Sequence, residues 1–224
     1  MTAPDTRAAT YREVFAVREF RALFAGFGTL IIGDSVRMLA LSVLIYTSTG
    51  SPLLTALAYV SGFLPNALGG SFLLALADRW RPRTLIVGYD LLRLGVAVVL
   101  AAGILPPLGM VALVLAAGIF APVAMAARTA LLPDLLDGDA YVLARSLFTI
   151  ASGGTQIVGF AAGGLLVTLV GPQGALWLAA VTCAVSAGLV RLGLAERPAR
   201  RAAHAGAVRE TWRVNGRLRR RPAC

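Results

Sequence analysis

The chain has 224 residues, of which 58% are hydrophobic and only 14% are charged, and its mean hydropathy is +0.76. These values lie outside the range of soluble globular domains and indicate an integral membrane protein. The net charge of +10 is divided among separate loops, which argues against a nucleic-acid-binding protein. Two cysteines and a single histidine are too few for a disulfide framework or a metal site, so we expect no metal and no cofactor.

The N-terminal residues are polar and mixed in charge, and the apolar stretch after them is longer than the 7–15-residue core of a signal peptide. We therefore expect no signal peptide. The composition divides the chain into a cytoplasmic N-terminal arm (residues 1–22), a transmembrane bundle (residues 23–195) and an arginine-rich cytoplasmic tail (residues 196–224).

Six apolar stretches follow the arm, each long enough at roughly 1.5 Å per residue to cross a hydrocarbon core about 30 Å thick. Backbone groups in lipid must form hydrogen bonds within their own segment, so the spans are predicted to be helices of an all-α membrane protein. Pro65 and Pro122 are expected to kink the second and fourth spans. The predicted spans are Leu23–Tyr46, Leu53–Ala77, Leu85–Leu105, Leu108–Ala127, Leu147–Val170 and Ala175–Leu194.

The positions of the arginines predict the orientation in the membrane. All 21 basic residues are arginine. Apart from Arg37 and Arg93 they lie in the arm, in the loops after the second and fourth spans, or from Arg191 at the end of the sixth span onward into the tail. Positively charged loops stay in the cytoplasm, so this pattern predicts a multi-pass protein of the cell membrane (plasma or inner), with both termini cytoplasmic. The opposite connectors carry no charge: Thr47–Pro52, Pro106–Pro107 and Gly171–Gly174.

Two pairs of ionisable residues lie inside the predicted spans. Asp34 is near mid-membrane in the first span, and Arg37 follows at i+3, where the two side chains share one face of the helix. Asp90 and Arg93 repeat this spacing in the third span, closer to its cytoplasmic end. Charges within a membrane span line a substrate or ion pathway, or form internal ion pairs that hold helices together. Both interpretations stay open for the first pair, and we interpret the second as an internal ion pair.

The loop after the second span carries a recognisable motif. Residues 74–83 read Leu-Ala-Leu-Ala-Asp-Arg-Trp-Arg-Pro-Arg. This segment resembles the signature loop of the major facilitator superfamily, whose pattern is Gly-x-Leu-Ala-Asp-Arg-x-Gly-Arg-Arg/Lys. The resemblance implies that Asp78, Arg79 and Arg83 form a gate on the cytoplasmic side. Positions 74, 81 and 82 depart from the pattern; the matching residues are Leu76, Ala77, Asp78, Arg79 and Arg83.

Further segments resemble the drug-efflux branch of that family, which contains the macrolide and enterobactin exporters. They are Glu19–Gly26, Ile32–Asp34 and Ala127–Leu136. In the fifth span, residues 159–164 are similar to the family's antiporter pattern Gly-Pro-x-x-Gly-Gly, with phenylalanine at the place of the proline. The resemblance implies export of small amphipathic compounds by proton antiport, and a helix-bend and packing role for Gly159, Gly163 and Gly164.

Transporters of this family have twelve helices in two halves, and this chain resembles the N-terminal half. Its fold is expected to be two inverted three-helix repeats, spans one to three and four to six. Residues 208–219 resemble the stretch that leads into the seventh helix. Alternating access needs two halves, so a second six-helix half or a second copy of the chain is an expected partner, beside the lipid bilayer and a small-molecule substrate. The alternative is a truncated or non-transporting membrane subunit.

No soluble-enzyme motif is present in the sequence: it has no phosphate-binding Gly-x-x-x-x-Gly-Lys segment and no metal-spaced histidine or cysteine cluster. We therefore predict a transporter rather than an enzyme, in which Asp34 responds to the coupling ion and Arg37 is its internal counter-charge. The arginines of the tail either hold anionic lipid or belong to a solvated connector.

Overall fold

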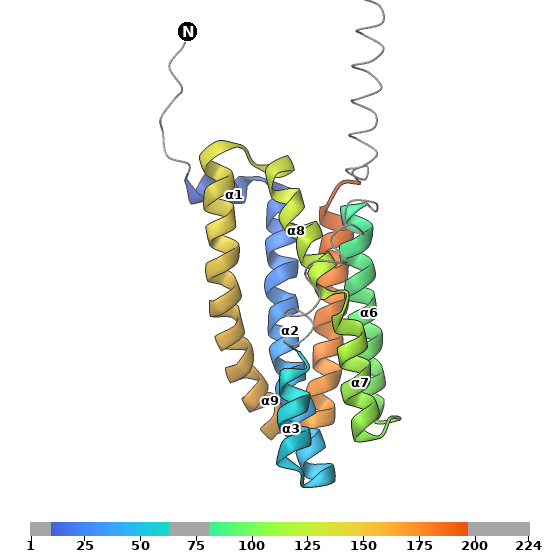
Figure 1. Ribbon diagram of the computed structural model, residues 1–224. Helices are drawn as coiled ribbons and strands as arrows, with labels where there is room; N and C mark the ends of the chain where they lie inside the picture. The colour runs from blue at the N-terminus through green and yellow to red at the C-terminus, as the bar shows by residue number, and fades with distance from the viewer. Residues whose placement is uncertain (1–9, 63–80, 197–224) are drawn as a thin grey trace, which may run out of the picture.

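The computed structural model describes residues 10–62 and 81–196, and these residues form helices joined by short turns (Figure 1). The long helices run roughly along one direction, with the short α1 lying across one end, and together they build an all-helical bundle, as the apolar composition predicts. The helices are α1 (Tyr11–Ala16), α2 (Arg18–Thr49), α3 (Pro52–Val60), α6 (Pro82–Ala102), α7 (Pro107–Gly118), α8 (Ala121–Leu135) and α9 (Gly138–Gly193).

The helix ends follow local sequence. Helix α2 stops where Gly50 adopts a left-handed backbone (φ 63°), and its N–H donates to the Tyr46 carbonyl at 2.8 Å. Helix α3 begins directly afterwards, with the Ser51 hydroxyl accepting from the Leu54 N–H and Pro52 in the first turn. Helix α6 ends in the same way as α2, at Gly103 with φ 66°. Short uncharged turns thus connect successive helices at this end of the bundle.

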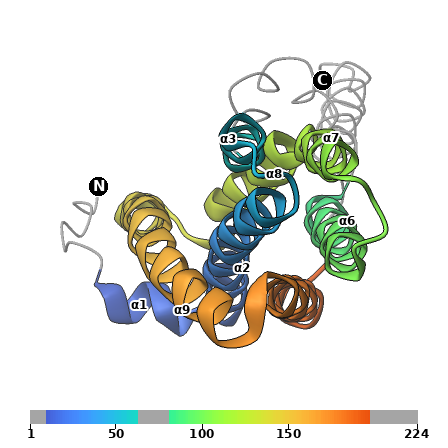
Figure 2. The ribbon, with the colours of Figure 1, turned by 90° about the horizontal axis from the view of Figure 1, so that it is seen from below.

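Helix α9 contains 56 residues, which at about 1.5 Å per residue is far longer than one crossing of a bilayer. Its backbone leaves the helical region at Gly171 (φ 74°, ψ 170°), directly before Pro172. There the chain folds back, so α9 consists of two antiparallel arms, with α2 between them (Figures 1 and 2). The arms correspond to the predicted fifth and sixth spans, and the turn falls in the predicted uncharged connector.

The predicted fourth span is divided into α7 and α8 at residues 119–120. Pro122 explains the break, because it has no N–H to donate and its ring would clash with the carbonyl of Gly118, the last residue of α7. The kink expected at Pro122 is therefore present. Pro65 and most of the second predicted span, Leu53–Ala77, lie outside the described residues.

Within residues 10–62 and 81–196, four helical stretches are long and apolar enough to cross a membrane: Arg18–Thr49, Pro82–Ala102, Pro107–Leu135 and Gly138–Gly193. An all-helical membrane protein is thereby supported. The arrangement as six spans in two inverted repeats stays a prediction, because the second span is described only to residue 62.

Two apolar cores lie toward opposite ends of the bundle. One gathers around Leu41, Leu100 and Leu176, and the other around Phe20 and Leu131. The second core is rich in aromatic contacts, with several phenylalanine rings from α2 edge-on or tilted against Phe148 of α9. Between these cores α2 carries Asp34 and Arg37, so charged side chains occupy a layer across the middle of the bundle.

Close approach of α2 to α9 depends on small residues. A Cβ added at Gly159 would lie 2.8 Å from the Ser35 Cβ, and one at Gly163 would lie 3.1 Å from the Val36 Cα. Gly164, one residue further, faces no described atom within 4 Å. Helices in membranes associate through such close van der Waals packing. Gly159 and Gly163 therefore lie at the helix contact, and the backbone stays helical through all three positions.

Replacing Gly33 of α2 by alanine should destabilise the bundle. The new Cβ would lie 1.8 Å from the Thr182 Oγ1 and 2.9 Å from the Thr182 Cβ, and overpacking of this kind costs about 1–3 kcal/mol. The matched control is Gly95→Ala on α6, where a Cβ meets no described atom within 4 Å and only helix propensity changes. Thermal unfolding in detergent measures both variants, and equal melting temperatures would contradict the contact.

Candidate functional site

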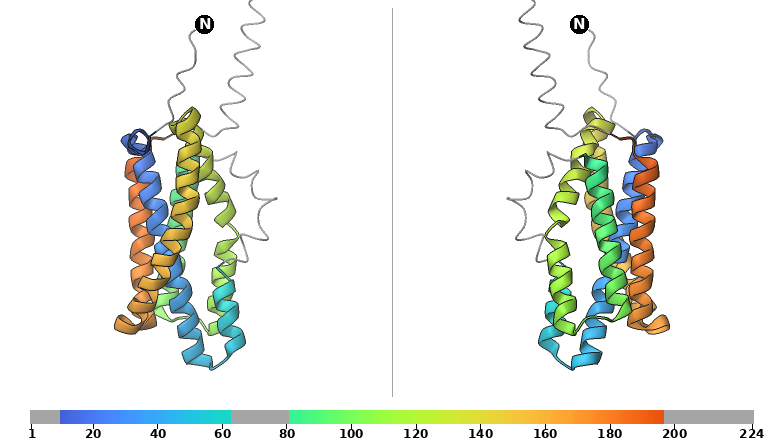
Figure 3. Two further views of the ribbon diagram at one scale, coloured as in Figure 1. Left: turned by 90° about the vertical axis from the view of Figure 1, so that its left-hand side faces the viewer. Right: turned by 90° about the vertical axis from the view of Figure 1, so that its right-hand side faces the viewer.

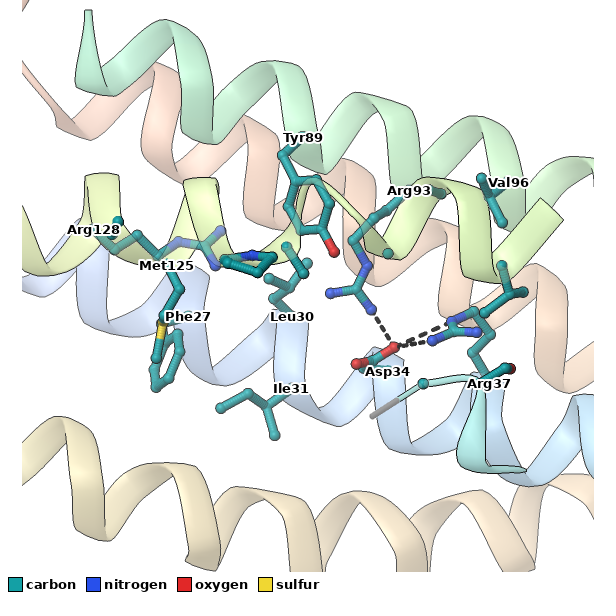
Figure 4. Close-up of a pocket in the computed structure, with 18 residues that line it drawn as sticks. Phe27, Leu30, Ile31, Asp34, Arg37, Tyr89, Arg93, Val96, Met125 and Arg128 are labelled. Carbon is teal, nitrogen blue, oxygen red and sulfur yellow. Dashed lines mark hydrogen bonds and ion pairs between the residues drawn. The ribbon is translucent and has the colours of Figure 1, made fainter. Parts of the chain in front are cut away.

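The described residues line a half-open cavity of about 530 Å³ in the middle of the bundle. Helices α2, α6, α7 and α8 line it, together with residues 61–62, which directly follow α3 (Figure 4). Its wall is mostly apolar, with Leu30 and Ile31 from α2, Val96 from α6 and Met125 from α8. Charged side chains lie on the same wall, so the cavity combines an apolar surface with a few charged groups.

Asp34 is the acidic residue of the cavity wall and lies between two arginines (Figure 4). Its Oδ1 accepts a hydrogen bond from Arg37 Nε at 3.1 Å and also pairs with Arg37 Nη2. The same oxygen forms an ion pair with Arg93 Nη2 of α6. About 31% of the Asp34 side chain stays exposed. The contact between Asp34 and Arg37, three residues apart on one helix, is the one that the sequence predicts.

The expected ion pair between Asp90 and Arg93 is wrong. Asp90 is fully buried and pairs with Arg128 of α8 at 2.8 Å, whereas Arg93 pairs with Asp34. The physical reason is that Asp90 and Arg93 each pair with an opposite charge on a neighbouring helix, which places both charges inside the bundle and away from lipid. Arg93 is thus part of the cavity wall in mid-helix rather than a shallow structural residue.

The hydroxyl of Ser186 adds a hydrogen bond to the ion pair between Asp90 and Arg128. It donates to Asp90 Oδ2 at 2.7 Å and lies 3.0 Å from the Gly26 carbonyl of α2. The network therefore joins α6 to α8 through Arg128, and α6 to the second arm of α9 through Ser186. The Arg128 side chain, which is 3% exposed, also lies over the Phe27 ring. This buried network positions four helices around the cavity.

Arg128 and Ser186 are members of the site that sequence reasoning missed. Arg128 was assigned to the cytoplasmic end of the fourth span, but α8 continues to Leu135 and buries it. One sequence signal points to this position. The residues after it, Thr129 to Leu132, stay apolar apart from one threonine, so the helix does not end at the arginine. Ser186 gives no comparable signal, because isolated serines are common in membrane helices.

The predicted gate loop is described only in part. Asp78 and Arg79 lie outside the described residues. Arg83 donates a hydrogen bond to the carbonyl of Arg191 at the end of α9. Arg81, which departs from the signature pattern, forms an exposed ion pair with Glu196 at 3.3 Å. The beginning of α6 is thereby tied to the end of α9 at one end of the bundle.

No group of three or more histidine, cysteine or acidic residues that could hold a metal ion is found within residues 10–62 and 81–196. The free thiol of Cys183 is buried in the second arm of α9. The chemistry that the described site offers is therefore ion pairing and hydrogen bonding on an apolar wall.

Removing the charge of Asp90 should destabilise the fold strongly. In Asp90→Asn the Arg128 guanidinium stays buried without an acid, which costs about 3–5 kcal/mol. The matched control, Glu196→Gln, breaks an exposed pair and should cost at most about 1 kcal/mol. Chemical unfolding in detergent measures both losses. The double variant Asp90→Asn/Arg128→Gln should recover part of the stability, and its failure to do so would count against the pairing.

The family model for the Major Facilitator Superfamily matches residues 23–223, which is nearly the whole chain. Comparison with curated proteins gives no match. The matched region contains the bundle, the cavity and both buried ion pairs. Members of this family are membrane transporters for small molecules. The chain therefore belongs to the major facilitator superfamily, a family of transporters rather than enzymes.

Proposed function

We propose that the chain forms a six-helix half of a secondary transporter that exports small amphipathic compounds by proton antiport and alternating access. The observation that carries this proposal is a carboxylate on the cavity wall, Asp34, placed at the middle of α2 and held by arginines from two helices. Ionisable groups inside membrane spans are typical of ion and substrate pathways. The apolar lining supports an amphipathic substrate.

The ion pairs of Asp34 suggest how a proton is coupled to movement. Arg37 belongs to α2, as Asp34 does, whereas Arg93 belongs to α6, so the carboxylate joins two helices across the cavity. Uptake of a proton by Asp34 removes the negative charge that holds Arg93. The α2–α6 connection would then weaken at each proton-binding step and re-form at each release, which ties the proton to a change of conformation.

The contacts at the ends of α6 and α9 support a gate on the same side as the N-terminal helices. Arg83 and Arg81 reach the end of α9, and the Ala195 N–H donates to Glu19 of α2 at 3.2 Å. The beginning of α2 and the end of α9 therefore lie at one end of the bundle (Figures 1 and 3). In our proposal this end is cytoplasmic, since the arginine-rich segments flank it. Asp78 and Arg79 would complete the gate with Arg83.

Two further cases apply if the chain does not transport by itself: it works with a partner, or it is a non-transporting subunit. Alternating access requires a second body against which the bundle moves, supplied by another six-helix half or by a second copy of this chain. A truncated or non-transporting membrane subunit is the alternative, favoured by the three positions at which the gate loop departs from the family pattern.

Replacing Asp34 by asparagine should abolish proton-driven export. Asparagine keeps the size of the side chain and its ability to accept hydrogen bonds, but it does not take up a proton. The native product, purified from membranes and reconstituted in liposomes, is tested with an imposed pH gradient and a panel of amphipathic dyes. Gradient-driven flux should fall about tenfold or more, whereas flux down a dye gradient should persist.

The control for this experiment is Asp134→Asn, which removes an exposed carboxylate near the end of α8 and should leave flux unchanged. Unchanged gradient-driven flux in Asp34→Asn would remove Asp34 from the coupling role. Absence of flux in the unaltered protein would favour the non-transporting alternative.

The mass of the assembly in native membranes distinguishes these proposals. With an antibody against residues 1–20, cross-linked membranes should yield a species of about twice the 23.3 kDa of this chain, because two halves are needed for alternating access. The same blot without cross-linker separates one longer chain from two associated chains. A species of 23.3 kDa alone after cross-linking would contradict the two-half assembly.

A further inference from the structure

The charges buried around the cavity do not balance. Arg37, Arg93 and Arg128 face two carboxylates, those of Asp34 and Asp90. Asp90 is occupied by Arg128, at 2.8 Å, and by the Ser186 hydroxyl. Among the residues that the structure describes, Asp34 alone is left to pair with two arginines, so this part of the cavity wall carries an excess of one positive charge.

Residues 63–77 of the predicted second span lie outside the described residues, and their sequence contains no acidic residue. Residues 63–77 read Phe-Leu-Pro-Asn-Ala-Leu-Gly-Gly-Ser-Phe-Leu-Leu-Ala-Leu-Ala, without an ionisable side chain. The next acidic residue is Asp78, in the predicted cytoplasmic loop. From its sequence, the second span therefore brings no carboxylate to neutralise the excess charge.

Two buried guanidinium nitrogens, Arg37 Nη1 and Arg128 Nε, have no hydrogen-bond partner among the described residues, and the first of them lies beside the carboxylate that two arginines share. The other two nitrogens of the Arg37 side chain, Nε and Nη2, both contact Asp34. Only 8% of Arg37 is exposed, and the residue lines the cavity. A buried guanidinium with an unsatisfied N–H is costly, and an anionic acceptor is its best partner.

We infer that the cavity binds an amphipathic organic anion, whose carboxylate or similar head group contacts Arg37 and Arg93. The inference rests on the proposed function and gives the charge of its substrate. The cavity volume of about 530 Å³ accommodates one or two fused rings beside the head group. Leu30, Ile31 and Val96 cover the apolar body. A cationic compound of the same shape meets two guanidinium groups and is disfavoured.

Equilibrium binding tests this assignment without any gradient. The native product, in lipid nanodiscs, is titrated calorimetrically with three probes of one shape: 2-naphthoate, the neutral 2-naphthamide and the cationic 2-naphthamidine. We expect 2-naphthoate to bind about tenfold more tightly than the amide, and the amidine to bind most weakly. Acetate, which has the head group without the rings, should bind far more weakly than 2-naphthoate.

Variants identify the residues responsible. Arg37→Gln should remove the preference for 2-naphthoate over the amide, and Arg37→Lys, which keeps the positive charge, should retain most of it. The matched control is Arg145→Gln, an exposed arginine of α9 outside the cavity, which should bind all probes as the unaltered protein does. Thermal unfolding of each variant verifies that it is folded.

Equal affinity for the three naphthalene probes would overturn the inference, as would an unchanged preference in folded Arg37→Gln. Acetate binding as tightly as 2-naphthoate would overturn its amphipathic part. These outcomes are independent of coupling. The protein can prefer the anion even if Asp34→Asn still exports with the pH gradient, which would refute the coupling role alone. Equally, the preference can be absent although Asp34→Asn no longer exports, which would refute the anion site alone. The two proposals therefore fail separately.

Discussion

Charge in a low-dielectric bilayer must be paired, and this requirement organises the middle of the bundle. Asp34 and Asp90 each bind an arginine from another helix, Arg93 of α6 and Arg128 of α8. Apolar cores above and below need only hydrophobic residues of suitable size, but the layer between them needs partners at matching depths. The two ion pairs therefore set the register of α2, α6 and α8, and the cavity lies where the helices are held together by charge rather than by close packing.

Much of the fold could be predicted because lipid permits few structures. The lengths of the apolar stretches gave the helices, the uncharged connectors gave the turns near Gly50, Gly103 and Gly171, and Pro122 gave the break between α7 and α8. A packing role was predicted for Gly159, Gly163 and Gly164 together, but the sequence did not show that the first two face α2 and the third does not. Which face of a helix points to its neighbour depends on the rotation of each helix about its axis. A helix that is apolar on all sides has no sequence pattern that indicates this rotation.

The site was predictable where both partners share one helix. Asp34 and Arg37 are three residues apart, and helical geometry alone brings them together. The same rule failed for Asp90 and Arg93, because nearer partners arrive from other helices and local spacing contains no information about them. Arg128 illustrates the limit most clearly: its burial follows from the continuation of α8 beyond the expected end of the span. Pairs across helices become predictable only once the depths of their residues are known.

The location of the excess positive charge near the middle of α2 has an electrical consequence. If the bundle rocks so that the cavity faces first one side of the membrane and then the other, this charge changes its place within the transmembrane field. A full elementary charge crossing the membrane corresponds to about 2.3 kcal/mol per 100 mV, and a partial crossing corresponds to a fraction of that energy. An anion seated on Arg37 and Arg93 would cancel the charge. Loaded and empty forms would then differ in their response to voltage, and the membrane potential would favour the return of one form over the other.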